Sequence, residues 1–441
     1  MLRRLAVFSL LLTSLSAQPP LALHPPMGWN SWDSFGLTVT ESEFKANAQW
    51  LASNLKQHGW QYVVVDEGWY LKNPEAKPGQ FQFTMGPDGR YLPAVNRFPS
   101  AASDAGFKPL ADYVHSLGLK FGIHIIRGIP REAAKRDLPI AGSQFRAAEA
   151  ADQSDTCSWN ADNYGVKYTP AGQAYYDSLA KLYASWGLDF IKVDCIAEPY
   201  KGDEIRMISD ALRKSGRPIV LSLSPGPAPL DKASELRTEA NLWRISGDVW
   251  DSWSHDPKIG YAQSLSGQFP VAASWARYVE PDHWPDADML PIGYLGPRPG
   301  AGEPRQTRFT HEEQRTLLSL WCIFRSPLFM GGNLTRMDEW TRSALTNDEL
   351  IAVDQRSSGG HEITRDAKKA VWIAKDVNGR GAYVALFNLS GSQQTLEYPL
   401  QALGVGTSVQ IRDVWAKRDL GHADQLKASL APHDAALFHI Y

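Results

Sequence analysis

Short apolar runs alternate with longer amphipathic segments over roughly the first 330 residues of the chain. The apolar runs are typical of strands buried on both faces, and we expect strands at 61–66, 119–125, 189–194, 218–222 and 241–245. The segments between them repeat apolar residues at helical spacing, so helices are expected at 41–58, 107–117, 169–186, 203–214 and 312–324. Glycine follows several of these helices, as at Gly59, Gly118 and Gly187, and suits the residue that ends a helix.

The repeated strand and helix unit predicts a parallel sheet with helical crossovers, and therefore the α/β fold class. The number of units suits a closed (β/α)8 TIM barrel, which we place at residues 18–356. An open doubly wound sheet is the alternative, but no glycine-rich phosphate loop follows the first predicted strand.

The pattern changes near residues 356–360, where Arg-Ser-Ser-Gly-Gly interrupts it. Beyond this point apolar residues alternate with polar ones, which predicts strands at 370–374, 382–388, 395–398, 408–414 and 435–441. Turn pairs such as Asn378-Gly379 and Ser390-Gly391 separate them. We expect a C-terminal antiparallel β-sandwich over 360–441, with its last strand tied into a sheet and a packing or substrate-supporting role.

The N-terminus has the layout of a secretory signal peptide, which we place at residues 1–17. Arg3 and Arg4 precede the apolar stretch 5–12, and small residues follow up to Ala17. The stretch is too short to span a bilayer, and no later run is long and apolar enough to do so. We therefore expect an exported protein, periplasmic or extracellular, with no membrane span in the mature chain; a frayed core segment is the alternative.

Composition narrows the class of partner. The chain has 45 Lys and Arg against 48 Asp and Glu, so its net charge of -3 gives no electrostatic reason to expect nucleic acid. A neutral or polar small substrate fits better. The 16 tryptophans suit the apolar faces of sugar rings, although a large core also uses many aromatic residues.

An oxidising compartment permits a disulfide among the three cysteines. Cys322 lies in an apolar, helix-like stretch and is expected to be a buried free thiol. That leaves Cys157 and Cys195 as the candidate pair.

Two carboxylates stand at the ends of predicted strands. Asp194 closes Asp-Phe-Ile-Lys-Val-Asp, and Asp248 follows Trp-Arg-Ile-Ser-Gly. Enzymes with a TIM barrel do their chemistry at the C-terminal tips of the strands, so the pair is interpreted as a nucleophile and an acid. A helix N-cap is the alternative for any one such aspartate.

Other polar side chains join the two carboxylates on the same rim. Asp66 and Glu67 follow the first predicted strand, and Lys192 shares the strand face of Asp194. Arg244 stands four residues before Asp248, and Asp288 belongs to an acidic cluster further along the chain. Many acids on one rim suit a hydroxyl-rich ligand. Because they are spread over separate strands and interleaved with tryptophans, we expect no metal ion and no cofactor.

Five short motifs stand in register along the chain: Pro-Met-Gly-Trp-Asn-Ser-Trp at 26–32, Val-Asp-Glu-Gly-Trp at 65–69, Lys-Val-Asp-Cys at 192–195, Trp-Arg-Ile-Ser-Gly-Asp at 243–248 and Asp-Ala-Asp-Met-Leu at 286–290. Arg-Ser-Pro-Leu-Phe-Met-Gly-Gly at 325–332 and Ile-Ala-Val-Asp-Gln at 351–355 follow. Together they resemble glycoside hydrolase family 27, the alpha-galactosidases or melibiases. The likeness runs from about residue 25 to the C-terminus, and five motifs in register make it specific.

The resemblance implies a retaining exo-glycosidase that releases terminal alpha-D-galactosyl residues from oligosaccharides or polysaccharides. Asp194 matches the nucleophile and Asp248 the acid/base, whose carboxyl groups stand about 5–5.5 Å apart in retaining enzymes. Asp194 should be kept ionised, with Lys192 as the expected cause, and Asp248 should carry a proton. Arg244 resembles a residue that binds a substrate hydroxyl, and Trp29 the aromatic floor under the sugar. Cys157 and Cys195 match a disulfide beside the active site.

Three departures from the family pattern leave the sugar open. Glu67 replaces the second residue of the usual Asp-Asp pair, and its extra length could fill the space of the sugar's exocyclic CH2OH, which favours beta-L-arabinopyranose. His124 stands in place of a tyrosine and either binds a hydroxyl or simply packs. Ser224 replaces a glutamate-containing loop and could leave room for an N-acetyl group, as in an alpha-N-acetylgalactosaminidase. A non-catalytic galactose-binding protein is the alternative from another class, but binding alone requires neither acid.

Overall fold

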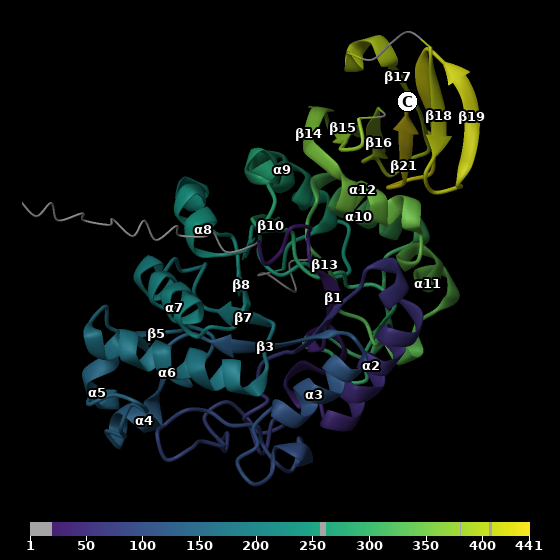
Figure 1. Cartoon of the computed structure of the whole chain (residues 1–441). Helices are drawn as coiled ribbons and strands as arrows, with labels where there is room; N and C mark the ends of the chain where they lie inside the picture. The colour runs from purple at the N-terminus through teal and green to yellow at the C-terminus, as the bar shows by residue number, and fades with distance from the viewer. Residues whose placement is uncertain (1–19, 256–261, 380, 405–407) are drawn as a thin grey trace, which may run out of the picture.

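The computed structural model describes residues 20–255, 262–379, 381–404 and 408–441. Within them the chain forms a curled parallel sheet wrapped by helices, followed by a smaller antiparallel domain at the C-terminus (Figure 1). The predicted signal peptide at 1–17 lies outside the described residues. In the part of the chain that is described, no helix combines the length and the apolar character needed to cross a membrane.

Eight short strands make up the parallel sheet. They are β1 (Met27–Asn30), β2 (Tyr62–Val65), β3 (Lys120–Ile126), β7 (Phe190–Asp194), β8 (Val220–Leu223), β9 (Leu242–Arg244), β10 (Trp284–Asp286) and β13 (Leu328–Met330). The sheet runs in the order β10-β9-β8-β7-β3-β2-β1-β13, and all neighbours are parallel. A parallel bridge between Leu290 and Met330 joins the two ends of this order. The predicted TIM barrel is confirmed.

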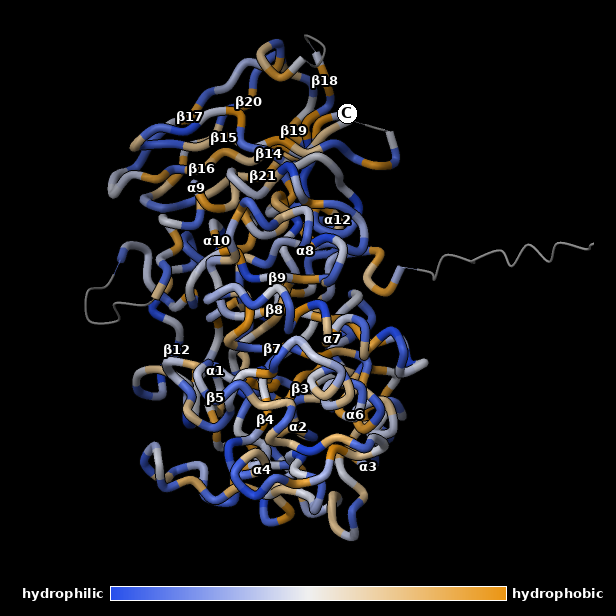
Figure 2. Tube along the Cα trace, turned by 90° about the vertical axis from the view of Figure 1, so that its left-hand side faces the viewer, coloured by the Kyte–Doolittle hydropathy of each residue, from blue (hydrophilic) through white to orange (hydrophobic). Residues whose placement is uncertain are grey.

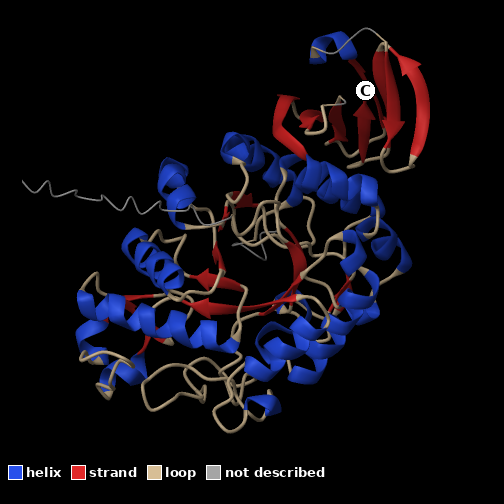
Figure 3. Cartoon of the chain, in the orientation of Figure 1, coloured by secondary structure: helices blue, strands red, loops and turns tan. Residues whose placement is uncertain are grey.

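Helices cover the outside of this sheet (Figure 3). The longer ones are α2 (Glu41–Asn54), α3 (Lys108–Ser116), α6 (Pro170–Trp186), α7 (Gly202–Lys214), α8 (Ala233–Glu239), α9 (Leu265–Trp275), α10 (His311–Phe324), α11 (Glu339–Leu345) and α12 (Asp348–Arg356). Shorter elements in the loops are α1 (Trp32–Phe35), β4 (Ile129–Pro130), α4 (Arg131–Lys135), α5 (Ala147–Ala150), β5 (Ala151–Thr156), β6 (Asn163–Val166), β11 (Tyr294–Leu295) and β12 (Arg305–Gln306). Thr40 begins α2 with a capping box, and Gly187, at φ +86°, ends α6 as predicted.

The interior of the barrel changes from apolar to polar along the strands. Its base is filled by one cluster of side chains from six strands: Tyr62, Val64, Phe190, Val220, Leu242, Trp284 and Phe329. Because side chains alternate along a strand, the residue two positions further on faces the same way. That residue is polar on several strands: Lys192 after Phe190, Arg244 after Leu242 and Asp286 after Trp284. A packed apolar plug therefore supports a polar cavity at the C-terminal ends of the strands.

The C-terminal domain is an antiparallel β-sandwich, as predicted. Its strands are β14 (Ser357–Arg365), β15 (Lys369–Asp376), β16 (Ala382–Asn388), β17 (Gln394–Pro399), β18 (Val409–Asp413), β19 (Arg418–Ala423), β20 (Gln425–Leu430) and β21 (Ala435–Ile440). Six of them form the sheet β14-β15-β16-β21-β18-β19, and β17 pairs with β20. An apolar core lies between the two sheets. In Figure 2 hydrophobic residues follow the strands of both domains, and hydrophilic residues gather in the outer loops.

Helix α10 joins the sandwich to the barrel. Phe324 at its end meets Trp372 of β15 edge to face, and Arg315 pairs with Asp434 before β21. Phe269 of α9 packs against Phe387 of β16, with ring centroids 5.0 Å apart. The two domains therefore share one continuous core.

Candidate active site

A cavity of about 430 Å³ opens at the C-terminal ends of the barrel strands. Nearly all the residues predicted to form the site line it: Asp66, Glu67, His124, Lys192, Asp194, Ser224, Arg244, Asp248 and Asp288. They come from segments far apart in sequence that the parallel strands bring to one rim. These nine residues alone bring five carboxyl groups, two fixed cations and a histidine into one cavity.

Trp29 is the exception, and the prediction that it forms the floor under the sugar is wrong. Its side chain is fully buried outside the sheet against Phe35 and Phe44, and its ring N–H donates to the carbonyl of Gly332. Trp32, at the start of α1, lines the cavity instead. Gly300 lies so close to the Trp32 ring that an added Cβ would fall 2.4 Å from it, so the backbone of Gly300 packs directly against the indole.

Asp194 ends β7 with both carboxylate oxygens in hydrogen bonds. Oδ1 accepts the N–H of Cys195 at 2.6 Å, and Oδ2 lies 3.1 Å from Nε2 of His124 on the neighbouring strand β3. Burial alone would raise the pKa of Asp194, but the hydrogen bond and charge of His124, the charge of Lys192 and the Cys195 N–H together lower it. The group is therefore ionised, as a nucleophile must be, and His124 contributes more to this than Lys192.

We expect substitution of His124 by glutamine to move the acid limb of the kcat/KM profile to higher pH. In the nucleophile role that the family resemblance implies, a protonated Asp194 cannot attack, so we expect activity to be lost as pH falls through its pKa. Without the imidazolium that pKa rises, and the loss begins at higher pH. His115→Gln is the matched control, since His115 contacts Asp189 at the opposite end of β7, 2.7 Å away. If the acid limb stays in place in His124→Gln, Lys192 and the backbone N–H are sufficient to keep the pKa of Asp194 low.

Asp66 and Glu67 lie side by side but carry opposite protonation states. Burial would raise the pKa of Asp66, but His124, Lys192 and hydrogen bonds from Glu67 N–H and the Asn30 amide lower it. Lys192 Nζ lies 3.7 Å from Asp66 Oδ2, so the lysine pairs with Asp66. Burial raises the pKa of Glu67 to about 8, against the charge of His124 and with the help of Asp194 and Asp66. Glu67 thus presents an uncharged carboxyl group to the cavity near neutral pH.

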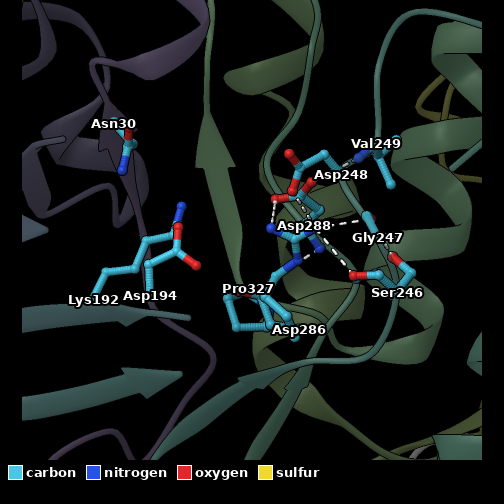
Figure 4. Close-up of polar contacts among 12 residues, drawn as sticks. Asn30, Lys192, Asp194, Ser246, Gly247, Asp248, Val249, Asp286, Asp288 and Pro327 are labelled. Carbon is cyan, nitrogen blue, oxygen red and sulfur yellow. Dashed lines mark hydrogen bonds and ion pairs between the residues drawn. The ribbon is translucent and has the colours of Figure 1, made fainter. Parts of the chain in front are cut away.

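Asp248 lies across the cavity from Lys192 and Asp194, beside Asp288 (Figure 4). Arg244 contacts Asp248 Oδ1 at 3.3 Å and Asp288 Oδ1 at 2.8 Å, and the N–H of Val249 donates to Asp288 Oδ2 at 2.7 Å. Burial raises the pKa of Asp288 to about 7, opposed by Arg244 and reinforced by the charge of Asp248. The Asp288 carboxyl group therefore keeps its proton up to near-neutral pH. The Asp248 side chain is 41% exposed, so it can reach a bound substrate.

Cys157 and Cys195 form the predicted disulfide, and Cys322 is a buried free thiol, as predicted. The bond ties the loop after β5 to the residue that follows Asp194. Arg127 supports the same junction by donating to the carbonyl of Cys195 at 2.7 Å. The backbone directly after Asp194 is thus fixed by two contacts.

Two further residues that line the cavity were not predicted from the sequence. Asp33 follows the first motif directly, and its buried Oδ2 has no hydrogen-bond partner among the described residues. Burial, with the charge of Asp288, raises the pKa of Asp33 well above its usual value. Trp159 lies two residues after Cys157. Their positions next to a recognised motif and a cysteine were the only signals available.

Glu67, His124 and Asp194 could together hold a metal ion, because one ligand atom from each lies within 4.8 Å of the others. Burial lowers the pKa of His124, but the charges of Asp66 and Asp194 and the hydrogen bond to Asp194 raise it overall. A protonated imidazole has no lone pair for a metal. The donor set therefore fits an ion-paired nucleophile better than a metal centre.

Comparison with known proteins agrees with this geometry. Residues 154–356 match the family model described as alpha galactosidase A, and 366–440 match the alpha galactosidase C-terminal beta sandwich domain. Alpha-galactosidase from Coffea arabica is 30% identical over 95% of this chain and 94% of its own length. A family 27 beta-L-arabinopyranosidase from Geobacillus stearothermophilus is 48% identical, with a TM-score of 0.90 over 95% of this chain and 97% of that one.

A protein from Bacillus halodurans, provisionally assigned as an alpha-N-acetylgalactosaminidase, is 43% identical, with a TM-score of 0.83 over 94% of this chain and 96% of that one. The relatives therefore span three sugars on one scaffold. The chain is a glycoside hydrolase that belongs to the alpha-galactosidase family, glycoside hydrolase family 27.

Proposed function

We propose that the protein is a retaining exo-glycosidase that prefers terminal beta-L-arabinopyranosyl residues and cleaves alpha-D-galactosyl residues more slowly. The observation that carries this preference is Glu67, a neutral carboxyl group one methylene longer than aspartate, in the wall of the cavity beside Asp66. The two sugars share their ring hydroxyl pattern, but the pentopyranose lacks the exocyclic CH2OH. The likeness to the Geobacillus enzyme supports this order of preference, which reverses the one expected from the sequence.

The proposed reaction uses the two sides of the cavity in turn. Asp194 attacks the anomeric carbon while the glycosidic C–O bond breaks, and Asp248 gives its proton to the departing oxygen. Water then attacks the same carbon from the side that the leaving group vacated. Asp248 takes its proton, and the bond to Asp194 breaks. Two inversions at one carbon retain its configuration.

The remaining charged groups fit supporting roles. Asp66, held ionised by Lys192 and His124, can accept hydrogen bonds from sugar hydroxyls. Arg244 keeps Asp248 and Asp288 together. Trp32 offers the aromatic surface that the sequence assigned to Trp29.

An N-acetylgalactosamine substrate is a second candidate. Ser224 lines the cavity as a small side chain on the loop after β8, where the family resemblance places contacts to the 2-position. Rates on p-nitrophenyl glycosides of beta-L-arabinopyranose, alpha-galactose and alpha-N-acetylgalactosamine decide among the three. We expect the rates to fall in that order. A fastest rate on the alpha-galactoside would instead identify the protein as an alpha-galactosidase.

Shortening Glu67 to aspartate should raise the ratio of kcat/KM for the galactoside to that for the arabinopyranoside by at least about tenfold. One methylene in a pocket is worth about 10–200-fold in discrimination, and the shorter side chain makes room for the hydroxymethyl group. Glu198→Asp, the same change elsewhere on the cavity wall, is the matched control. Equal changes on both sugars in Glu67→Asp would show that Glu67 does not read this part of the sugar.

Export to the periplasm or the medium completes the proposal. The disulfide between Cys157 and Cys195 supports it, because such bonds persist mainly in oxidising compartments.

A further inference from the structure

Trp159 is an exposed large apolar side chain in the wall of the cavity. Half of its surface is exposed, whereas Asp66, His124 and Arg244 deeper in the same cavity are almost completely buried. Single exposed apolar residues are common on protein surfaces and need no explanation. Trp159 differs because it lies at the entrance to the site, where a substrate must pass.

The loop that carries Trp159 is fixed at both ends. On one side Cys157 is bonded to Cys195, with the two Cα atoms 6.0 Å apart. On the other side Asp162 accepts a hydrogen bond from Tyr70, and Asn163 donates to the carbonyls of Ile126 and Arg127 at 3.1 and 3.0 Å.

The strand that leads into the loop is held as well. Asp155 of β5 pairs with Arg127 at 2.8 Å and with Lys201 at 2.9 Å. The indole makes no hydrogen bond with the described residues, and half of its surface is exposed, so its N–H and part of its face remain available to a ligand. The structure therefore places an exposed aromatic surface in the cavity wall, on a loop that is fixed at both ends.

We propose that Trp159 is the platform for the leaving group, a sugar ring attached to the residue that is cleaved. This proposal rests on the proposed function, since an exo-acting enzyme encloses only the terminal sugar. The rest of the substrate must then leave the cavity past its rim. An indole offers a flat, apolar surface that is complementary to the C–H face of a pyranose, and its N–H can donate to a hydroxyl.

The test compares two substrates with the same terminal sugar, whichever the wild type cleaves fastest. One is the glycosyl fluoride, whose single-atom leaving group cannot reach the rim, and the other is a disaccharide. In Trp159→Ala the ratio of kcat/KM for the disaccharide to that for the fluoride should fall about tenfold, which corresponds to about 1.4 kcal/mol. Trp159→Phe, which keeps a flat ring, should lose less. Tyr168→Ala, at another exposed aromatic residue outside the cavity, is the matched control.

A second measurement uses the glycosyl-enzyme itself. With the fluoride as donor, an added acceptor sugar competes with water: its hydroxyl oxygen attacks the anomeric carbon, Asp248 takes its proton and the bond to Asp194 breaks. The ratio of transfer to hydrolysis is set after the intermediate has formed, so it does not depend on how much enzyme is folded. It should fall about tenfold in Trp159→Ala at subsaturating acceptor.

The outcomes separate this proposal from the proposed function. If the wild type cleaves both substrates and Trp159→Ala leaves the kcat/KM ratio and the transfer ratio unchanged, the platform proposal is wrong and the glycosidase proposal stands. Equal losses on fluoride and disaccharide also overturn it, because they place Trp159 against the terminal sugar. A wild type that cleaves neither substrate overturns the proposed function and the platform with it.

Discussion

Replacing Asp194 with alanine should lower kcat on the preferred p-nitrophenyl glycoside by at least about 10⁴-fold, with the fold intact. The carboxylate is the group that forms the covalent intermediate in the proposed mechanism, and His124, Lys192 and the Cys195 N–H are arranged to keep it ionised. Among the described cavity residues, Asp194 is the carboxylate that is hydrogen-bonded to both His124 and the Cys195 N–H. Circular dichroism and thermal unfolding establish that the variant is folded.

Azide identifies the role of the missing group. In Asp194→Ala, azide can enter the vacated space and attack the anomeric carbon opposite the leaving group, so the glycosyl azide should have inverted configuration. Asp189→Asn is the matched control, because Asp189 stands at the other end of β7, where it binds His115 and Arg217. It should cost stability and leave the chemistry in place. Residual activity of Asp194→Ala above about one per cent, or an azide product of retained configuration, would contradict the nucleophile assignment.

Replacing Asp248 with alanine should have the second largest effect, and it should depend on the leaving group. General acid catalysis contributes about 10²–10⁴-fold. A sugar alkoxide needs the proton, so kcat/KM on a disaccharide should fall by about that factor. A nitrophenolate leaves without a proton, so its glycoside should lose far less in the first step, and hydrolysis of the intermediate should become rate-limiting.

Azide again reports the role, now with the opposite stereochemistry. It needs no general base, so it should accelerate turnover of the nitrophenyl glycoside by Asp248→Ala and give a glycosyl azide of retained configuration. Asp251→Ala is a control on the same loop, since Asp251 is a buried partner of Arg305 that does not line the cavity. Equal losses of kcat/KM on the disaccharide and the nitrophenyl glycoside would contradict the acid/base role of Asp248.

The sequence predicted strands where an apolar run was long enough to be distinctive. Strands β2, β3, β7, β8 and β9 lie in such runs, whereas β1, β10 and β13 were not predicted. Strand β1 contains Gly28 and β10 reads Trp-Pro-Asp, so neither shows a continuous apolar run. In the sandwich, β14 contains Gly359 and Gly360, where the sequence predicts only a change of pattern between the two domains. Gly360 is required there because a Cβ would lie 2.1 Å from the carbonyl oxygen of Ile323 on α10. Such close approach between distant segments leaves no local pattern.

Side-chain partners across strands were harder to predict than positions along one strand. Alternation along β7 correctly placed Lys192 on the face of Asp194, but the register of β3 and β7 sets His124 beside Lys192. His124 then reaches Asp194, and Lys192 turns to Asp66. Likewise, Trp29 and Trp32 stand three residues apart in one motif, and only the packing of Trp29 against α2 decides which indole faces the substrate.

The position of β21 affects how the protein can be made. This strand lies in the middle of the large sheet, between β16 and β18, so β18 and β19 join that sheet only through residues 435–440. Until those residues leave the ribosome, one edge of β16 has no partner, and unpaired edges recruit other chains. The interval before β21 emerges is thus the period in which a nascent chain is most prone to aggregate. A chain truncated before residue 435 would stay in that state indefinitely, whatever the condition of the catalytic barrel.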